Sequence, residues 1–532
     1  MQMYERQPPI PGRQEERKNI MNQLRILISG GGLAGLTAAY WLHRNGHQPV
    51  VIERAPELRS DGYAIDFFGT GYDVAERMGI IDTLAGKQLF MGDNGAVAFV
   101  DEDGKAKAEL KLDAMRKVLD NKYLPLMHYT LEETIYDAVK QDVEIRFNTS
   151  IATVSQSADA VTVTFDDGQR ESFDLLIGAD GIHSNVRSLV FGPESDFACY
   201  MGYYMACYFV PHNEQQQATW ENYNEPGRQA GVYNSDRDGQ SITLFIWQAD
   251  DEGYVPHAQR AQKLRSAYEG MGWITPQLLD DMPADGGDIF MDTVTQIRMN
   301  TWRNGRVVLA GDAAGCMTPI SGQGASMALA SAYVLADELS QTDDWQQALA
   351  VYEQRVKPQF DLRQQKARDF AKQFVPGSEM GVKTQTVLMK LITYQAFSGL
   401  LKTQFVGDSF LKTAALHRLP QSSGNVLGYR VAGKLHVTDY QTLTIGIEEI
   451  LKASDEVRLL LQLDGLEGIE SGALWQDWKF GREYHEKIAK VVIIGDKRWE
   501  RWLARLSSPL YAVESRFFHP DDIDNAWAWL RS

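Results

Sequence analysis

Residues Ile26 to Arg54 read ILISGGGLAGLTAAYWLHRNGHQPVVIER and place a cluster of glycines between two apolar runs. The first run, Leu24 to Ser29, is short and continuous, as in a strand buried on both faces of a parallel sheet. From Leu33 to Arg44 apolar residues recur at helical spacing, and Gly46 follows as a typical residue just after a helix end. The run PVVIER predicts a second buried strand. The segment therefore predicts one strand–helix–strand unit of the length that dinucleotide-binding folds use.

Each glycine of the G-x-G-x-x-G pattern has its own role in this interpretation. Gly30 makes the tight turn, Gly32 lets the backbone approach a pyrophosphate, and Gly35 lets the helix pack closely on the strand. The helix N-terminus offers N–H groups and a positive dipole end to the phosphates. Glu53, 23 residues after Gly30, can accept hydrogen bonds from ribose hydroxyls. A plain tight loop is the alternative, and the motif by itself does not distinguish NAD from FAD.

Two further motifs, distant in the sequence, also place glycine directly after a predicted strand. Residues Asp174 to Arg187, DLLIGADGIHSNVR, predict a strand, a turn and a helix start, with Asp180 as a simple cap in the alternative reading. Residues Gly305 to Leu339 predict a strand ending at Gly311, a loop and a long helix of small residues. Asp312 can bond a ribityl hydroxyl, and the loop and helix N-terminus suit the N1–C2=O edge of a flavin. The loop residues concerned are Pro319, Gly322, Gln323 and Gly324.

These three motifs, in this order, resemble those of the group A FAD-dependent aromatic monooxygenases of the para-hydroxybenzoate hydroxylase type, especially the tetracycline- and polyketide-hydroxylating branch. The resemblance covers about residues 24 to 400. It implies that the ADP half of FAD lies at the first motif, and that the ribityl chain and isoalloxazine lie at Asp312 and its loop. It also implies that Asp180 and Gly181 belong to a motif that serves both FAD and NADPH. The residues assigned to the ADP half are Gly30, Gly32, Gly35, Glu53 and Arg54.

The chain departs from the family pattern at two positions. Gly315 stands where the family often has His, and His128 stands where an Arg commonly contacts the pyrophosphate, so His128 is either a contact or a plain surface residue. A single G-x-G-x-x-G leaves no second Rossmann domain, which matches a family in which NADPH or NADH binds only transiently. The resemblance further implies that a flavin C4a-hydroperoxide carries out the hydroxylation, so we assign no catalytic residue.

A substrate-binding sheet is expected over about residues 191–301, where strand-like runs alternate with turns. Its aromatic side chains could line a pocket or fill the sheet core, and both readings stay open. Together with residues 62–79, GYAIDFFGTGYDVAERMG, they indicate a large planar aromatic substrate. The pocket candidates are Tyr203, Tyr233, Phe245 and Trp247.

The C-terminal part reads as a separate small α/β domain, residues 426–532, after a linker at Leu419 to Asn425. It resembles the SpoIIAA-like (STAS-type) domains through GALWQDWKFG, IAKVVIIGDKRWERWLARL and FFHPDDIDNAWAWL. The resemblance implies a non-catalytic module with a protein or lipid partner. Ser471 is either a phosphorylation site or a helix cap. Before this domain, a charged helix from Asp344 to Arg368 should break near Pro358, and an apolar helix-like stretch follows.

Composition excludes several other classes. A formal net charge of −18 argues against a nucleic-acid partner. The three cysteines form no C-x-x-C pair, which predicts no metal site and no disulfides, but free thiols in a reducing, cytoplasmic compartment. Residues 1–22 read as a disordered extension rather than a signal peptide, and no apolar run is long enough for a transmembrane segment.

We therefore expect an α/β protein with a Rossmann-type FAD-binding domain, residues 23–420, that carries an inserted antiparallel β substrate domain, plus the small separate C-terminal α/β domain. The expected activity is hydroxylation of an aromatic or polyketide-like molecule with NAD(P)H and O₂. Two alternatives stay open: an oxygen-independent FAD dehydrogenase or reductase of the same fold, and an FAD-sensing regulatory protein that acts through its C-terminal domain. The sequence leaves open the substrate, the choice between NADH and NADPH, and the oligomeric state.

Overall fold

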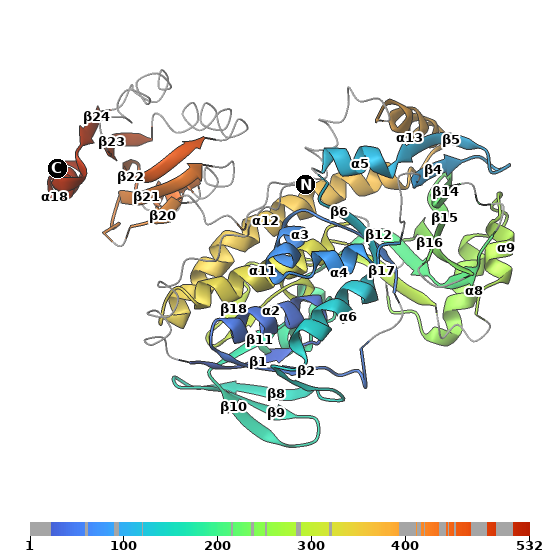
Figure 1. Ribbon diagram of the computed structural model, residues 1–532, viewed down its shortest axis with the longest axis horizontal. Coiled ribbons are helices and arrows are strands. Elements are labelled where there is room, and N and C mark those ends of the chain that lie inside the picture. Colours follow the sequence, from blue (N-terminus) through green and yellow to red (C-terminus); the bar gives the residue numbers. More distant parts are fainter. Residues whose placement is uncertain are drawn as a thin grey trace, which may run out of the picture. The chain divides into compact units, whose positions relative to one another are not determined.

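The computed structural model divides into two compact units, Met1–Asp408 and Ser409–Ser532, and each is described here by itself (Figure 1). The predicted extension, residues 1–22, lies outside the described residues. The described residues are 23–58, 62–89, 95–119, 121–213, 216, 218–235, 239–250, 253–283, 289–318, 322–392, 411, 416–419, 421–435, 443–444, 446–448, 450–451, 454–469, 487–495 and 514–532.

The first unit is built on a sheet that we call the parallel sheet, in the order β18-β19-β11-β1-β2-β7. Its members are β1 (Arg25–Ser29), β2 (Gln48–Ile52), β7 (Glu144–Arg146), β11 (Leu175–Gly178), β18 (Arg303–Asn304) and β19 (Val307–Leu309). All neighbours run parallel except β18, which pairs antiparallel with β19. The buried residues of β1, β2, β11 and β19 form near-continuous apolar runs, as expected of strands covered on both faces.

The topology of this sheet brings the three glycine motifs together. β1 lies between β2 and β11, and β19 lies next to β11, so the loops that follow these strands meet at one edge. Helices α2 (Leu33–Arg44) and α11 (Gly324–Leu339) start at that edge and contact each other. In open α/β sheets, ligands bind in the crevice at the carboxyl ends of the strands. The Rossmann-type architecture predicted from the sequence is confirmed.

The second large sheet of this unit, which we call the wall sheet, has eight strands. They are β17 (Phe290–Ile297), β12 (Ala198–Cys207), β16 (Gln240–Gln248), β15 (Arg228–Asn234), β14 (Trp220–Glu225), β4 (Ala96–Val100) and β5 (Ala106–Lys111), with β13 (Phe209–Pro211) on β16. The expected range, residues 191–301, omits β4 and β5, and β4 pairs parallel with β14. A pairing so distant in sequence leaves no local signal, because each strand alone only shows alternation.

The first unit also contains smaller sheets and short helices. β3 (Ala64–Phe68) and β6 (Tyr123–Met127) form an antiparallel pair, and β8 (Ile151–Gln156), β9 (Val161–Phe165) and β10 (Arg170–Phe173) form a three-stranded sheet. The short helices are α3 (Thr70–Met78), α4 (Ile81–Ala85), α5 (Leu112–Val118), α6 (His128–Val139), α7 (Asn185–Val190), α8 (His257–Ala267), α9 (Thr275–Asp280) and α10 (Asp312–Gly315), with a 3-10 turn at Glu194–Asp196.

The expected break at Pro358 is wrong. Helix α12 (Trp345–Phe374) continues through this proline, and α13 (Glu379–Ile392) follows it. A proline removes one backbone hydrogen bond and usually kinks a helix, but packing can outweigh that cost. Here Tyr352, Val356 and Phe360 are fully buried on either side of Pro358, so the apolar face of α12 stays continuous with the core.

The C-terminal unit is a five-stranded sheet in the order β20-β21-β22-β23-β24, with α18 (Ile523–Arg531) packed on β22 and β23. The strands are β20 (Leu416–Arg418), β21 (Val426–Leu435), β22 (Val457–Ile469), β23 (Ile488–Ile494) and β24 (Glu514–Phe518). Val426, Leu460, Val492 and Trp527 share one core cluster. The described strands and α18 agree with the predicted small α/β domain, whereas Ser471 lies outside the described residues.

The segment Leu419–Asn425 is a hairpin connection rather than a linker. β20 before it pairs antiparallel with β21 after it, and both belong to the C-terminal sheet. The Ser422 hydroxyl donates to Leu419 O and accepts from Gly428 N, which closes the turn. Pro, Ser, Gly and Asn serve both linkers and tight turns, so composition alone could not separate the two.

Candidate FAD and substrate site

A cavity of about 1020 Å³ begins at the carboxyl edge of the parallel sheet and extends beneath the wall sheet. The loops after β1, β2, β11 and β19 all contribute residues to it, and so do β3, β4, β5 and α13. All residues that line it fall between Ser29 and Leu388, within the first unit.

The first motif has the geometry that a dinucleotide loop requires. Gly30 has φ +112°, and a Cβ there would lie 2.3 Å from Ala179 O; a Cβ on Gly35 would lie 1.9 Å from Gly30 O. Glu53 accepts hydrogen bonds from Gly31 N (2.8 Å) and Ala55 N (2.9 Å), which hold its carboxylate against the loop. Gly30, Gly32, Glu53 and Arg54 line the cavity, whereas Gly35 serves the packing of α2 on the sheet.

His128 also lines this end of the cavity. It is the first residue of α6, and its Nδ1 lies 3.7 Å from Glu132 Oε2 on the same helix face. The position is therefore part of the cavity wall rather than a plain surface site.

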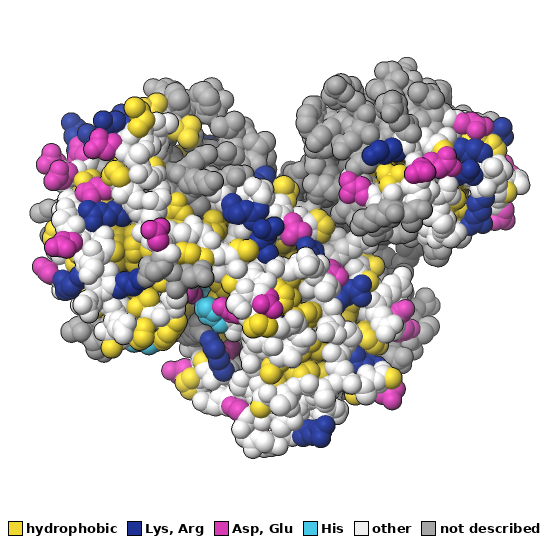
Figure 2. All heavy atoms as spheres, turned by 180° about the vertical axis from the view of Figure 1, so that it is seen from behind, with side chains coloured by type: hydrophobic (Ala, Val, Ile, Leu, Met, Phe, Trp, Pro, Cys, Tyr) yellow, Lys and Arg dark blue, Asp and Glu magenta, His cyan; other side chains and the backbone are white. Residues whose placement is uncertain are grey.

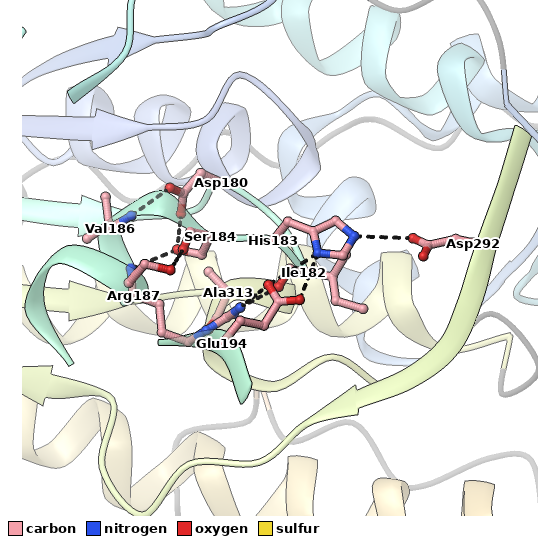
Figure 3. Close-up of polar contacts among 10 residues, drawn as sticks. Asp180, Ile182, His183, Ser184, Val186, Arg187, Glu194, Asp292 and Ala313 are labelled. Atoms are coloured by element: carbon pink, nitrogen blue, oxygen red, sulfur yellow. Dashed lines mark hydrogen bonds and ion pairs between the residues drawn. The ribbon is translucent and has the colours of Figure 1, made fainter. Parts of the chain in front are cut away.

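In the second motif Asp180 holds the loop before α7. Its carboxylate accepts from Val186 N (3.0 Å) and from the Ser184 hydroxyl, as Figure 3 shows. Burial raises the pKa of Asp180, against the lowering effect of these hydrogen bonds. Gly181 has φ +79°, and both Asp180 and Gly181 line the cavity. Asp180 therefore holds the start of α7, as the capping alternative predicted, and it also lines the cavity.

A network that sequence reasoning missed extends from this loop to the wall sheet (Figure 3). His183 Nδ1 lies 2.9 Å from Glu194 Oε1, and its Nε2 lies 3.5 Å from Asp292 Oδ2 on β17. Asp292, and secondly Glu194, raise the pKa of His183 to about 9, against the lowering effect of burial. Arg187, whose side chain is fully buried, pairs with Glu194 at 2.9 Å and donates to Ala313 O at 3.2 Å. His183 and Arg187 stood in the quoted motif, but nothing local pointed to Asp292.

The third motif places an isolated carboxylate at the cavity. Gly311 has φ +59°, and Asp312 follows as the first residue of α10. Burial raises the pKa of Asp312 to about 6, and no hydrogen bond or ion pair compensates it among the described residues. Gly322 and Gly324 line the cavity and leave open space where a Cβ would stand. Gln323 instead precedes α11, where its carbonyl accepts from Met327 N, and Pro319 lies outside the described residues.

These features fit FAD. An enclosed carboxylate without a partner is costly, and a ribityl hydroxyl would supply the missing hydrogen bond at Asp312. The glycine loop at the start of α2 leaves room for a pyrophosphate, and the loop before α11 leaves room for a flat ring. The chemistry and the space of this site therefore fit FAD.

Of the four aromatic pocket candidates, Tyr233 lines the cavity and the other three do not. The Tyr233 hydroxyl accepts from Ala64 N at 2.8 Å, which ties the wall sheet to β3. Phe245 and Trp247 point to the opposite face of the wall sheet, where they pack with Tyr208, Tyr204 and Tyr268. Tyr203 is buried in the core cluster beside the cavity. The core alternative thus holds for three of the four.

The part of the cavity that lies beneath the wall sheet has a mainly apolar lining. It is formed by β4, β5, α5 and the inner face of the wall sheet. The apolar residues concerned are Val97, Phe99, Leu110, Met115, Val118, Leu119, Met205, Leu244, Ile246 and Phe290.

Other site types find no support in the described part of the chain. No cluster of His, Cys, Asp or Glu there could hold a metal ion, and all three cysteines are free thiols. Among the described helices, none combines the length and apolarity needed to cross a bilayer. On the face drawn in Figure 2, basic and acidic side chains are interspersed rather than gathered in one basic patch.

Fold and site together define a flavoprotein with a Rossmann-type domain and a cavity whose wall is apolar along the wall sheet. The family model described as "FAD binding domain" matches residues 23–360, and a SpoIIAA-like model matches residues 426–531. The chain belongs to this FAD-binding family and is an FAD-dependent monooxygenase that carries a C-terminal SpoIIAA-like domain.

Several known proteins are similar to this chain in sequence or in structure. An uncharacterized protein of Mycobacterium tuberculosis is 39% identical over 62% of this chain and 88% of its own length. A flavin-dependent monooxygenase of Legionella longbeachae is 33% identical over 59% of this chain and 80% of its own. The crystal structure of tetracycline destructase Tet(51) matches with a TM-score of 0.60 and 28% identity, covering 72% of this chain and 98% of the other. Klebsiella pneumoniae HpxO, complexed with FAD and uric acid, shares the fold at 23% identity and a TM-score of 0.62, over 73% of this chain and 98% of its own.

Proposed function

We propose that the protein uses NAD(P)H and O₂ to hydroxylate an aromatic or polyketide-like small molecule. The observation that carries the proposal is the continuity of the cavity. It joins the Asp312 carboxylate, which has no partner among the described residues, to an apolar wall on β4, β5 and β16. One structural neighbour is a tetracycline destructase, and another was crystallised with FAD and uric acid. Tetracycline and uric acid both contain fused rings.

The reaction consumes one NAD(P)H, one H⁺ and one O₂ for each hydroxylated product and releases NAD(P)⁺ and one water. FAD, when bound, would supply the redox chemistry that links NAD(P)H, O₂ and the substrate. Glu53 would bind the ribose hydroxyls of the ADP half, and Asp312 would orient the ribityl chain. The apolar wall would exclude water from the reacting ring and hold the substrate beside the flavin.

The test is the source of the inserted oxygen atom. Purified full-length protein is incubated with NADPH, ¹⁸O₂ and a panel of phenols and aromatic polyketides that includes tetracycline. We expect at least one product to carry a single ¹⁸O atom, with NADPH oxidised in step. NADPH oxidation under strict anaerobiosis, with a reduced product and no ¹⁸O, would instead establish the dehydrogenase alternative.

We also propose a non-catalytic binding role for the C-terminal unit, with a protein or lipid partner. Its SpoIIAA-like match and the restriction of the cavity lining to the first unit support this role. Full turnover by a chain without this unit is the expected result.

A further inference from the structure

Asp66 is a carboxylate in the apolar part of the cavity. It lies on β3, its side chain lines the cavity, and Phe68, Leu119 and Met115 line the cavity around it. Protein surrounds the carboxyl closely enough to raise its pKa by desolvation, although Asp66 keeps accessible surface. The surface that remains therefore faces the cavity.

The carboxylate of Asp66 has one partner among the described residues. Tyr123 on β6 donates its hydroxyl hydrogen to Asp66 Oδ1 at 2.5 Å, across the antiparallel β3–β6 pair. Two cations lie near this pair. Lys122 is paired with Asp73 and Glu76, at 2.6 and 2.8 Å, and Arg116 donates to Gln88 Oε1 at 3.1 Å. Oδ2 of Asp66 is left as an acceptor at the cavity surface.

Several other acidic side chains that line the cavity already have partners. Glu53 accepts two backbone N–H groups, Asp180 holds the loop before α7, and Asp292 pairs with His183. Asp312 lies in the flavin motif. An enclosed acceptor without a donor carries a free-energy cost, which a ligand group can remove on binding.

We propose that Asp66 is a specificity-determining residue whose free carboxylate oxygen binds a hydrogen-bond donor on the aromatic substrate, either a phenolic hydroxyl or an ammonium group. The inference rests on the proposed function, because it takes this part of the cavity as the substrate site. Tyr123 positions the carboxylate by fixing Oδ1, so that Oδ2 points to the ligand. The apolar wall then contacts the ring.

Direct binding to the flavin-loaded full chain tests the proposal without turnover. The probes are 2-naphthol, 2-naphthylmethylamine and 2-methoxynaphthalene, which share one ring system and differ in the donor. Titration calorimetry should show at least one donor probe binding about ten-fold or more tightly than the ether, the range of a hydrogen bond to a charged group. The better donor probe distinguishes the hydroxyl from the ammonium source.

Asp66→Asn should abolish this preference, because the amide keeps an acceptor for Tyr123 but presents an NH₂ donor to the cavity. Asp137→Asn, on an exposed carboxylate of α6, is the matched control and should keep it. The proposal is overturned if the wild type binds all three probes equally tightly, or binds none of them. This outcome does not depend on whether the variant folds. A preference that survives in a flavin-loaded Asp66→Asn protein also overturns it, whereas absence of ¹⁸O in any product refutes only the proposed function.

Discussion

His183 and Asp292 form an ion pair between the loop after β11 and strand β17, with 3.5 Å between Nε2 and Oδ2. The pair joins the second glycine motif to the wall sheet (Figure 3), and both residues line the cavity. Glu194 contacts the other ring nitrogen, so the charged groups that face His183 are two carboxylates, with Arg187 behind Glu194.

This pair should make stability depend on pH in a defined direction. The pKa of His183 rises from 6.5 to about 9 on folding, so its contribution is complete below pH 6.5 and is lost as the pH rises through about 9. Because the side chain is half-exposed, we expect His183→Gln to lower the free energy of unfolding by only about 0.5–1 kcal/mol near neutral pH. Urea unfolding across this pH range measures the difference. The exposed His43→Gln is the control, and a gap that persists above pH 9 contradicts the assignment.

Asp312→Asn should stabilise the flavin-free protein while weakening the flavin complex. Burial raises the pKa of Asp312 from 3.8 to about 6, so the wild type loses stability relative to the variant as pH rises through that interval. Above it, the variant should be more stable by about 3 kcal/mol, and its affinity for FAD should fall by about ten-fold or more. Unfolding of the apoprotein and FAD titration measure the two effects. An apoprotein variant that is less stable at neutral pH would refute the prediction.

Two neighbouring glycines should respond differently to alanine. In Gly35→Ala the new Cβ would lie 1.9 Å from Gly30 O, so we expect unfolding free energy to fall by about 3 kcal/mol or more, or no soluble protein. In Gly32→Ala the nearest atom is Glu132 Oε2 at 3.9 Å, so the fold should survive. If the pyrophosphate approaches this backbone, Gly32→Ala will nevertheless weaken FAD binding. Unchanged flavin affinity in Gly32→Ala would place the pyrophosphate elsewhere.

Truncation should leave a well-behaved first unit only when the chain ends before β20, because β20 belongs to the C-terminal sheet. A chain ending at Asp408 should keep its flavin content and NADPH-dependent turnover, because all cavity-lining residues remain. A chain ending at Pro420 retains β20 without its partner β21, and the unpaired strand should promote aggregation. Size-exclusion chromatography and the ratio of flavin to protein absorbance measure both results. Loss of turnover in the shorter chain would assign the C-terminal unit a catalytic role.

Local chemistry explains what could be predicted from the sequence. A parallel strand followed by glycine and a helix is encoded within a few residues, so the three motifs and the Rossmann-type fold could be predicted from the sequence. The cofactor contacts suggested for Glu53 and Asp312 stay predictions, although both residues line the cavity. The α/β class of the C-terminal unit could be predicted from the sequence, but the pairing of β20 with β21 was missed. The α12 break and the Leu419–Asn425 linker were wrong, because proline and turn residues report local preference and cannot report the packing that overrides it.

The sequence by itself determined where the chain turns, which strands are buried, and which motif residues reach the edge of the parallel sheet. Only the tertiary structure decided which residues from distant segments share that edge. Alternation along β16 sends Phe245 and Trp247 to the core and Leu244 and Ile246 to the cavity, and the choice of face depends on what packs against the sheet. Asp66, Tyr123 and Asp292 acquire their partners through strand pairings and contacts that no local pattern encodes.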